Sequence, residues 1–151
     1  MEYGFAFFPG QGAQHPQMGQ ALYQSSTVAK EIFDRASSVA GLDVAKLCFE
    51  SSQEELNRTV NSQIAIFTHS LACYAALQDA GVSFKACAGF SLGEYTALVA
   101  AGILSVEDGI RLVRRRGQRF PQAAAAKAGL IGAIQGRGDG QVVQACGTGS
   151  G

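Results

Sequence analysis

Apolar residues fall along the chain in short runs that alternate with longer helical patterns. The run YGFAFF at residues 3–8 is rich in aromatic side chains and stops at Pro9-Gly10, which predicts a buried strand. A second short run at 86–89 leads directly into a glycine-rich turn. Longer segments with apolar residues at three- and four-residue steps separate and follow the two runs. This alternation indicates an α/β architecture with a parallel sheet.

Several helices are predicted between the two strands. Residues 19–39 fit one or two helices, and 42–49 fit a further short one. Residues 52–55 (SQEE) form a capping box, a pattern that begins a helix. The segment 64–80 has apolar residues recurring at helical steps and predicts a largely buried helix, with Gly81 in the position that ends it.

Two more helices are predicted after the second strand. Small residues dominate the segment up to 101–102, which favours a helix packed closely on the sheet. A second capping box at 105–108 begins a long helix that carries five arginines between 111 and 119. The alanine-rich residues 123–127 fit a helix end or a linker. Residues 130–134 then predict a new strand, and 139–146 the start of another helix.

The composition of the chain argues against several classes of protein and partner. A length of 151 residues allows one ordinary domain, and 47% hydrophobic with 16% charged residues is typical of a globular protein. The net charge is zero, which argues against nucleic acid or an anionic membrane as the main partner. We expect no signal peptide, since the start lacks a basic segment followed by a long apolar one. No run reaches the about 18 apolar residues of a membrane span.

The cysteines predict neither disulfides nor a metal site. Cys48, Cys73, Cys87 and Cys146 are widely spaced, and no histidine lies near them at metal-ligand spacing. Their apolar surroundings favour buried free thiols in a reducing compartment, and we therefore expect a cytoplasmic protein without a metal.

The strongest chemical signal is the sequence Gly-Phe-Ser-Leu-Gly at 89–93. A Gly-x-Ser-x-Gly pattern between a strand and a helix is typical of a nucleophile elbow, which holds a serine hydroxyl clear of the backbone. The backbone N–H of Leu92 would be one donor for the oxyanion formed when Ser91 attacks an acyl carbonyl. The loop containing Gln11 would supply the second, because it leaves the first strand at its carboxyl end.

A serine also needs a general base. The chain has two histidines, His15 in the glycine-rich loop and His69 inside a predicted helix. We expect His15 to be a surface loop residue and His69 a packed helix residue, so neither is a convincing base for Ser91.

Four motifs together resemble one enzyme family. They are FFPGQGAQ at 7–14, QIAI at 63–66, GFSLGEY at 89–95 and Arg-Gly at 116–117. In this order they resemble the malonyl-CoA:acyl-carrier-protein transacylases and the acyltransferase domains of fatty-acid and polyketide synthases. The resemblance runs from about residue 3 to residue 145.

The resemblance implies a fold and a domain division. It implies an α/β-hydrolase-like parallel-sheet core into which a small ferredoxin-like subdomain is inserted. Residues 1–126 would be the N-terminal part of the core, and 127–146 the start of the insert. Residues 147–151, which have no core-forming side chain, would be a linker-like tail.

The resemblance also implies a reaction. Ser91 would take a malonyl group from coenzyme A and pass it to the phosphopantetheine thiol of acyl carrier protein, in fatty-acid or polyketide biosynthesis. Gln11 and Leu92 would provide the oxyanion hole. No cofactor is expected, since the coenzyme A thioester is itself the substrate. Arg116 would pair with the malonyl carboxylate, and the substrate site would also include Gln63 and Phe90.

Two departures from the family pattern leave alternatives open. Phe90 stands where the family commonly has histidine, a change we expect to be tolerated. The catalytic histidine of the family lies in a C-terminal half that this chain is expected to lack, so a second polypeptide could supply it. The alternatives are a catalytically incomplete half-domain that acts as a binding or structural module, and an unrelated serine hydrolase.

Overall fold

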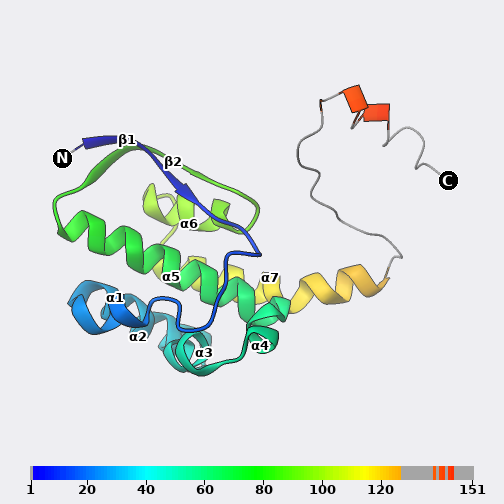
Figure 1. The fold of residues 1–151 in the computed structure, drawn as a ribbon, viewed down its shortest axis with the longest axis horizontal. Coiled ribbons are helices and arrows are strands. Elements are labelled where there is room, and N and C mark those ends of the chain that lie inside the picture. The colour runs from blue at the N-terminus through cyan, green and yellow to red at the C-terminus, as the bar shows by residue number, and fades with distance from the viewer. Residues whose placement is uncertain (1, 127–137, 139, 142, 145–151) are drawn as a thin grey trace.

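The computed structural model describes residues 2–126, 138, 140, 141, 143 and 144. Two strands, β1 (Glu2–Phe8) and β2 (Ser83–Gly89), pair in parallel from Glu2 opposite Ser83 to Phe8 opposite Gly89. The helices are α1 (Gln20–Ser25), α2 (Thr27–Ala40), α3 (Val44–Glu50), α4 (Gln53–Asn57), α5 (Thr59–Asp79), α6 (Gly93–Ala100) and α7 (Val106–Ala126) (Figure 1). The predicted α/β architecture with a parallel sheet is confirmed for this part of the chain.

Helix α5 is the centre of the molecule. The two strands and α6 lie on one side of it, and α1 to α4 lie on the other (Figure 1). The main core forms where α5 meets α2, α3 and α7, around Phe33, Phe67 and Val113. A helix with neighbours on most sides must be apolar on most sides, which explains why 64–80 shows apolar residues in nearly every direction.

The sheet is covered on one face. There Ala6 and Phe8 of β1 pack against Tyr74 of α5 and Ala97 of α6. On the opposite face, the side chains of Phe5 and Phe7 are 68% and 78% exposed. Parallel sheets are normally buried on both faces, so this face is an unusual apolar surface.

Two predicted boundaries were wrong. Helix α5 begins at Thr59, five residues before the predicted start, and strand β2 begins at Ser83 instead of residue 86. The first turns of α5 are polar in sequence, yet Ser62 and Gln63 are almost fully buried. Strand β2 is extended by backbone pairing with β1, which does not depend on apolar side chains.

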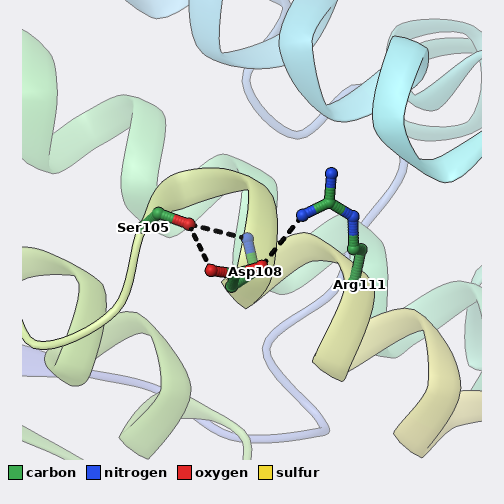
Figure 2. A network of polar contacts seen from close by, with 3 residues as sticks. All are labelled: Ser105, Asp108 and Arg111. Carbon is green, nitrogen blue, oxygen red and sulfur yellow. Dashed lines mark hydrogen bonds and ion pairs between the residues drawn. The ribbon is translucent and has the colours of Figure 1, made fainter.

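The predicted helix ends are confirmed. The Ser52 hydroxyl accepts a hydrogen bond from the Glu55 N–H, at 3.2 Å, and α4 begins there. At the start of α7, the Ser105 hydroxyl accepts from the Asp108 N–H at 3.0 Å and donates to its carboxylate at 2.8 Å (Figure 2). Gly81 follows α5 with a φ of +80°, a conformation that glycine adopts without steric cost.

The end of the chain is only partly described. Helix α7 extends through Ala126, so most of the alanine-rich segment is helix. The predicted strand at 130–134 and tail at 147–151 lie outside the described residues. Within 139–146, the four described residues are helical. No helix in the described ranges is long and apolar enough to cross a membrane.

Candidate active site

Ser91 lies on a sharp turn between β2 and α6. Its φ is +52°, a left-handed conformation that is uncommon for a residue other than glycine. A Cβ atom on Gly89 would lie 2.0 Å from the carbonyl carbon of Gly93, and one on Gly93 would lie 2.1 Å from the Phe8 oxygen. Side chains at these two positions are therefore impossible without moving the backbone. The predicted sharp turn between a strand and a helix, with Ser91 at its tip, is confirmed.

Backbone hydrogen bonds hold the turn against β1. The Phe90 N–H donates to the Phe8 oxygen at 3.0 Å, and the Gly93 N–H donates to the Phe90 oxygen at 2.8 Å. The Leu92 side chain is fully buried, while Ser91 is exposed. This anchoring leaves the serine hydroxyl accessible on a rigid support. The Phe90 side chain is 69% exposed, and its role in binding substrate stays a prediction.

Arg116 of α7 brings a positive charge to the serine. One guanidinium nitrogen, Nη2, lies 3.1 Å from the Ser91 Oγ and donates a hydrogen bond to it. The other, Nη1, donates to the Oε1 of Gln63. Because arginine has no acceptor, the Gln63 amide must present its oxygen to Arg116 and its nitrogen elsewhere.

That nitrogen, the Nε2 of Gln63, donates to the Oε1 of Gln11 at 3.1 Å. A chain of side-chain hydrogen bonds thus joins Ser91, Arg116, Gln63 and Gln11, which come from four separate segments. Gln63 is 1% exposed, so its two hydrogen bonds also satisfy a polar group that would be costly to bury alone. The structure brings together four of the predicted site residues.

Residue 117, a glycine directly after Arg116, lies where α7 packs closely on α5. A Cβ atom there would lie 3.2 Å from the Val60 Cα and 3.3 Å from the Gln63 Cβ. The absence of a side chain lets α7 approach α5 closely at the level of Gln63. This close approach puts the guanidinium of Arg116 within reach of both Gln63 and Ser91.

Two aromatic rings flank the guanidinium. The Cζ of Arg116 is 5.1 Å from the centre of the Phe120 ring and 5.8 Å from that of the Tyr95 ring. Both distances fall within the range of cation–π attraction. Neither ring was predicted as part of the site. The available signal was the four-residue step from Arg116 to Phe120, which places the two side chains on one helix face.

The loop that carries Gln11 is fixed by polar side chains. Gln11 Nε2 lies 3.4 Å from the Thr59 hydroxyl, and Gln14 accepts from the Gly12 N–H and donates to Asn57, each at 2.8 Å. Thr59 and Asn57 were not predicted, because nothing in their local sequence shows that the loop passes over them. A loop held in this way can keep a backbone N–H in a constant position.

The two histidines lie beside each other. Their ring centres are 6.5 Å apart, and the His69 Nε2 lies 3.4 Å from the Cys73 sulfur. Burial, and then the nearby His15, lower the pKa of His69. Within the described residues neither histidine hydrogen-bonds to Ser91.

The described cysteines are free, as predicted. Cys48 is buried, and burial raises the pKa of its thiol to about 12. Cys73 and Cys87 are only half-buried, so the prediction of buried thiols was wrong for these two. The residues that the structure describes contain no group of His, Cys, Asp and Glu side chains able to hold a metal.

Comparisons with known proteins agree with this geometry. The family model described as acyl transferase domain matches residues 6–148. A malonyl CoA-acyl carrier protein transacylase of Bacillus subtilis strain 168 is 43% identical over 129 residues, which are 85% of this chain and 41% of the relative. The malonyl CoA-acyl carrier protein transacylase of Clostridium perfringens superposes with a TM-score of 0.84 at 34% identity, over 98% of this chain and 47% of that one.

A third similar structure contains a type II PKS acyl-carrier protein in complex with its malonyl-transacylase. It matches with a TM-score of 0.75 at 39% identity, over 80% of this chain and 40% of that one. This chain thus spans less than half the length of each of these three relatives. The match covers both the elbow and the arginine helix, and the chain belongs to the acyl transferase domain family.

Proposed function

We propose that this chain carries the acyl-binding part of a malonyl transferase, which moves a malonyl group from coenzyme A to the phosphopantetheine thiol of acyl carrier protein. The observation that carries the proposal is the guanidinium of Arg116, 3.1 Å from the Ser91 hydroxyl. The similar transacylases named above support the same substrates.

The position of Arg116 suits a carboxylated acyl group. An ester of malonate on Ser91 has its free carboxylate only one methylene group away from the ester carbonyl. A planar guanidinium beside the serine oxygen can hold such a carboxylate with two hydrogen bonds. An acetyl group has no carboxylate and would gain nothing from Arg116, so the site should favour malonyl.

The chemistry proceeds in two steps. The Ser91 hydroxyl attacks the thioester carbonyl, its proton passes to a base, and coenzyme A leaves as a thiol after accepting a proton. The carrier thiol then attacks the malonyl ester and regenerates the serine. In both steps the N–H groups of Leu92 and Gln11 would stabilise the oxyanion.

The base belongs outside the described residues. We assign it to a histidine in a C-terminal half of the fold, located on a second polypeptide or a longer form of the chain. That half would complete an α/β-hydrolase-like core, with a ferredoxin-like insert beginning near residue 127. The free cysteines support a cytoplasmic location.

The test is acyl loading followed by mass spectrometry. Incubation with malonyl-CoA in the presence of a C-terminal half of a similar transacylase should add a malonyl group to the peptide that contains Ser91, and Ser91→Ala should abolish this adduct. Arg116→Ala should reduce malonyl loading more than acetyl loading from acetyl-CoA. An adduct that persists in Ser91→Ala would remove the nucleophile assignment, and equal losses of malonyl and acetyl would remove the carboxylate role of Arg116.

The alternative of a non-catalytic module predicts binding without turnover. In that case malonyl-CoA would bind, and no adduct would form even after a C-terminal half of a similar transacylase is added.

A further inference from the structure

The loop between β1 and α1 is held by hydrogen bonds, and not by packing, where it carries Gln11. Residues 11–13 are exposed, and Gly12 has a φ of +112° with no atom within 4 Å of the position that a Cβ atom would take. Ordering such a segment costs conformational entropy, which contacts with fixed polar groups must offset. Those groups come from the beginning of α5 and from α4, a helix of five residues beside the loop (Figure 1).

Two backbone groups determine how the side-chain amides around the loop are oriented. The Gly12 N–H can only donate, so Gln14 must turn its Oε1 towards this N–H, at 2.8 Å, and its Nε2 towards Asn57. The Gln14 carbonyl can only accept, so Gln53 must present its Nε2 there, at 3.2 Å. Both amide nitrogens then donate to one atom, the Oδ1 of Asn57, at 2.8 Å from Gln14 and 2.9 Å from Gln53.

Asn57 is itself fixed in place. It is the last residue of α4 and directly follows Leu56, whose side chain is fully buried. The Ser52 hydroxyl caps the start of the helix, and Asn61 of α5 donates to the Glu55 carbonyl at 2.9 Å. The Oδ1 of Asn57 is therefore an anchored acceptor on which the orientation of two glutamine amides depends.

We propose that Asn57 is a positioning residue that keeps this loop in the conformation that the oxyanion hole requires. It acts through the Gln14 amide on the peptide group between Gln11 and Gly12. Gln63 holds the Gln11 side chain independently, so the loop is fixed on both sides of this peptide group. The inference rests on the proposed function, because that function assigns the Gln11 N–H to the oxyanion.

This role differs from that of Arg116. Within the described residues Asn57 has no hydrogen bond to Ser91 or to Arg116. An oxyanion forms whichever acyl group is transferred, so loss of Asn57 should slow malonyl and acetyl loading alike. A displaced oxyanion donor weakens binding of the transition state more than binding of the thioester, so the maximal rate should fall while the half-saturating concentration stays unchanged.

The test compares Asn57→Leu with Asn57→Asp. Leucine has a similar volume but no acceptor, whereas aspartate keeps an oxygen that can accept from both amides. Loading of Ser91 is followed by mass spectrometry at several malonyl-CoA and acetyl-CoA concentrations, with a C-terminal half of a similar transacylase present. We expect Asn57→Leu to lower the maximal rate about tenfold for both acyl groups, and Asn57→Asp to restore most of it. Gln24→Leu, the same kind of change on the exposed surface of α1, is the control.

Three results of the loading experiment would overturn the assignment. The first is a maximal rate in Asn57→Leu equal to that of the unsubstituted chain. The second is an equal loss in Asn57→Leu and Asn57→Asp, which would show that the acceptor is not what matters. The third is a loss confined to malonyl, which would connect Asn57 with the carboxylate and not with the oxyanion.

Exchange of the Gly12 amide proton, measured by NMR, separates this inference from the proposed function because it needs no substrate. Without Asn57 the Gln14 amide is free to turn, so Gly12 should exchange about threefold faster or more in Asn57→Leu and at the original rate in Asn57→Asp. Unchanged exchange in Asn57→Leu would show that Asn57 does not hold the loop. If the unsubstituted chain is never labelled at Ser91, the proposed function fails, and the exchange rates still decide whether Asn57 positions the loop.

Discussion

At the scale of single residues, Gln63 joins two groups to which the proposed function gives separate tasks. One end of its amide holds Arg116, which would recognise the carboxylate, and the other holds the side chain of Gln11, whose loop would help stabilise the oxyanion. Its burial prevents water from replacing either partner easily. Under the proposed function, substrate recognition and carbonyl activation would therefore depend on the same buried side chain.

Replacing Gln63 with leucine should impair both tasks. Gln63→Leu keeps a similar volume but leaves Arg116 and Gln11 without their partner, and a hydrogen bond to a charged group contributes about 1.5–3 kcal/mol. We expect malonyl loading of Ser91 to fall about tenfold or more, with a reduced preference for malonyl over acetyl. Gln78→Leu, on the exposed end of the same helix, is the matched control. Unchanged acyl preference in Gln63→Leu would contradict the role in orienting Arg116.

At the scale of elements, the close contact between α5 and α7 depends on Gly117. Gly117→Ala should overpack this contact and destabilise the fold by about 1–3 kcal/mol, partly offset by the better helix propensity of alanine. Urea unfolding measures the change. Gly4→Ala is the control, because a Cβ atom there has no neighbour within 4 Å. Equal midpoints for the two variants would show that α7 is free to move away from α5.

The start of α7 should be sensitive to acid. Hydrogen bonds from Ser105, and then from Arg111, lower the pKa of Asp108. A carboxyl group whose pKa is lowered by folding adds stability above its unfolded pKa, and this stability is lost as the pH falls through the folded value. Ser105→Ala removes the first of these causes and the helix cap. This substitution should lower the free energy of unfolding by about 1 kcal/mol at pH 7. It should also make the free energy of unfolding less dependent on pH below 4. Urea titrations at pH 7 and pH 3 compare the two proteins, and an unchanged pH dependence would contradict the assignment.

Local sequence predicted the elements whose cause is local. The elbow at Ser91 follows from Gly89 and Gly93, which permit a turn that other residues would block. The Ser52 and Ser105 caps follow from hydroxyl groups placed three residues before an N–H. The early start of α5 could not be predicted in this way, because the burial of polar Gln63 depends on contacts from two distant segments.

Local sequence was also insufficient to predict the contacts among the residues around Ser91. Arg116, Gln63 and Gln11 were identified through motifs, but their hydrogen-bonded chain appears only after α7 packs on α5. Tyr95 was missed because its ring reaches Arg116 only through the packing of α6 beside α7, whereas Phe120 lies one helical turn after Arg116 on α7 and its four-residue spacing was overlooked. Single-residue patterns carry no information about the packing of one helix beside another.

At the scale of the whole molecule, the open face of the sheet is the largest departure from a closed core. Phe5 and Phe7 project from it, and they also line an apolar groove between β1 and α5 together with Phe8, Tyr74 and Leu77. Exposed apolar surface of this kind promotes association. Under the proposed function, the C-terminal half of the fold would cover this sheet.

Self-association should therefore respond to substitutions on this face. Phe5→Thr/Phe7→Thr should shift the protein towards the monomer in analytical ultracentrifugation, because it removes two exposed rings and keeps residues that favour strands. Ile103→Thr, which changes an isolated exposed apolar residue, is the control. A monomeric unsubstituted chain at all concentrations would show that the open face does not drive association.

The parallel pairing of β1 with β2 also determines the order in which the molecule can fold. Its paired residues lie about eighty positions apart in the chain, whereas helices α1 to α5 can form and pack from nearby segments. Closing a loop of this length lowers the chain entropy before the contacts between the paired strands can stabilise the fold. The turn at Ser91 is anchored on β1, so Ser91 reaches its position in the folded structure only after this closure. Packing of helices α1 to α5 should consequently precede formation of the turn at Ser91.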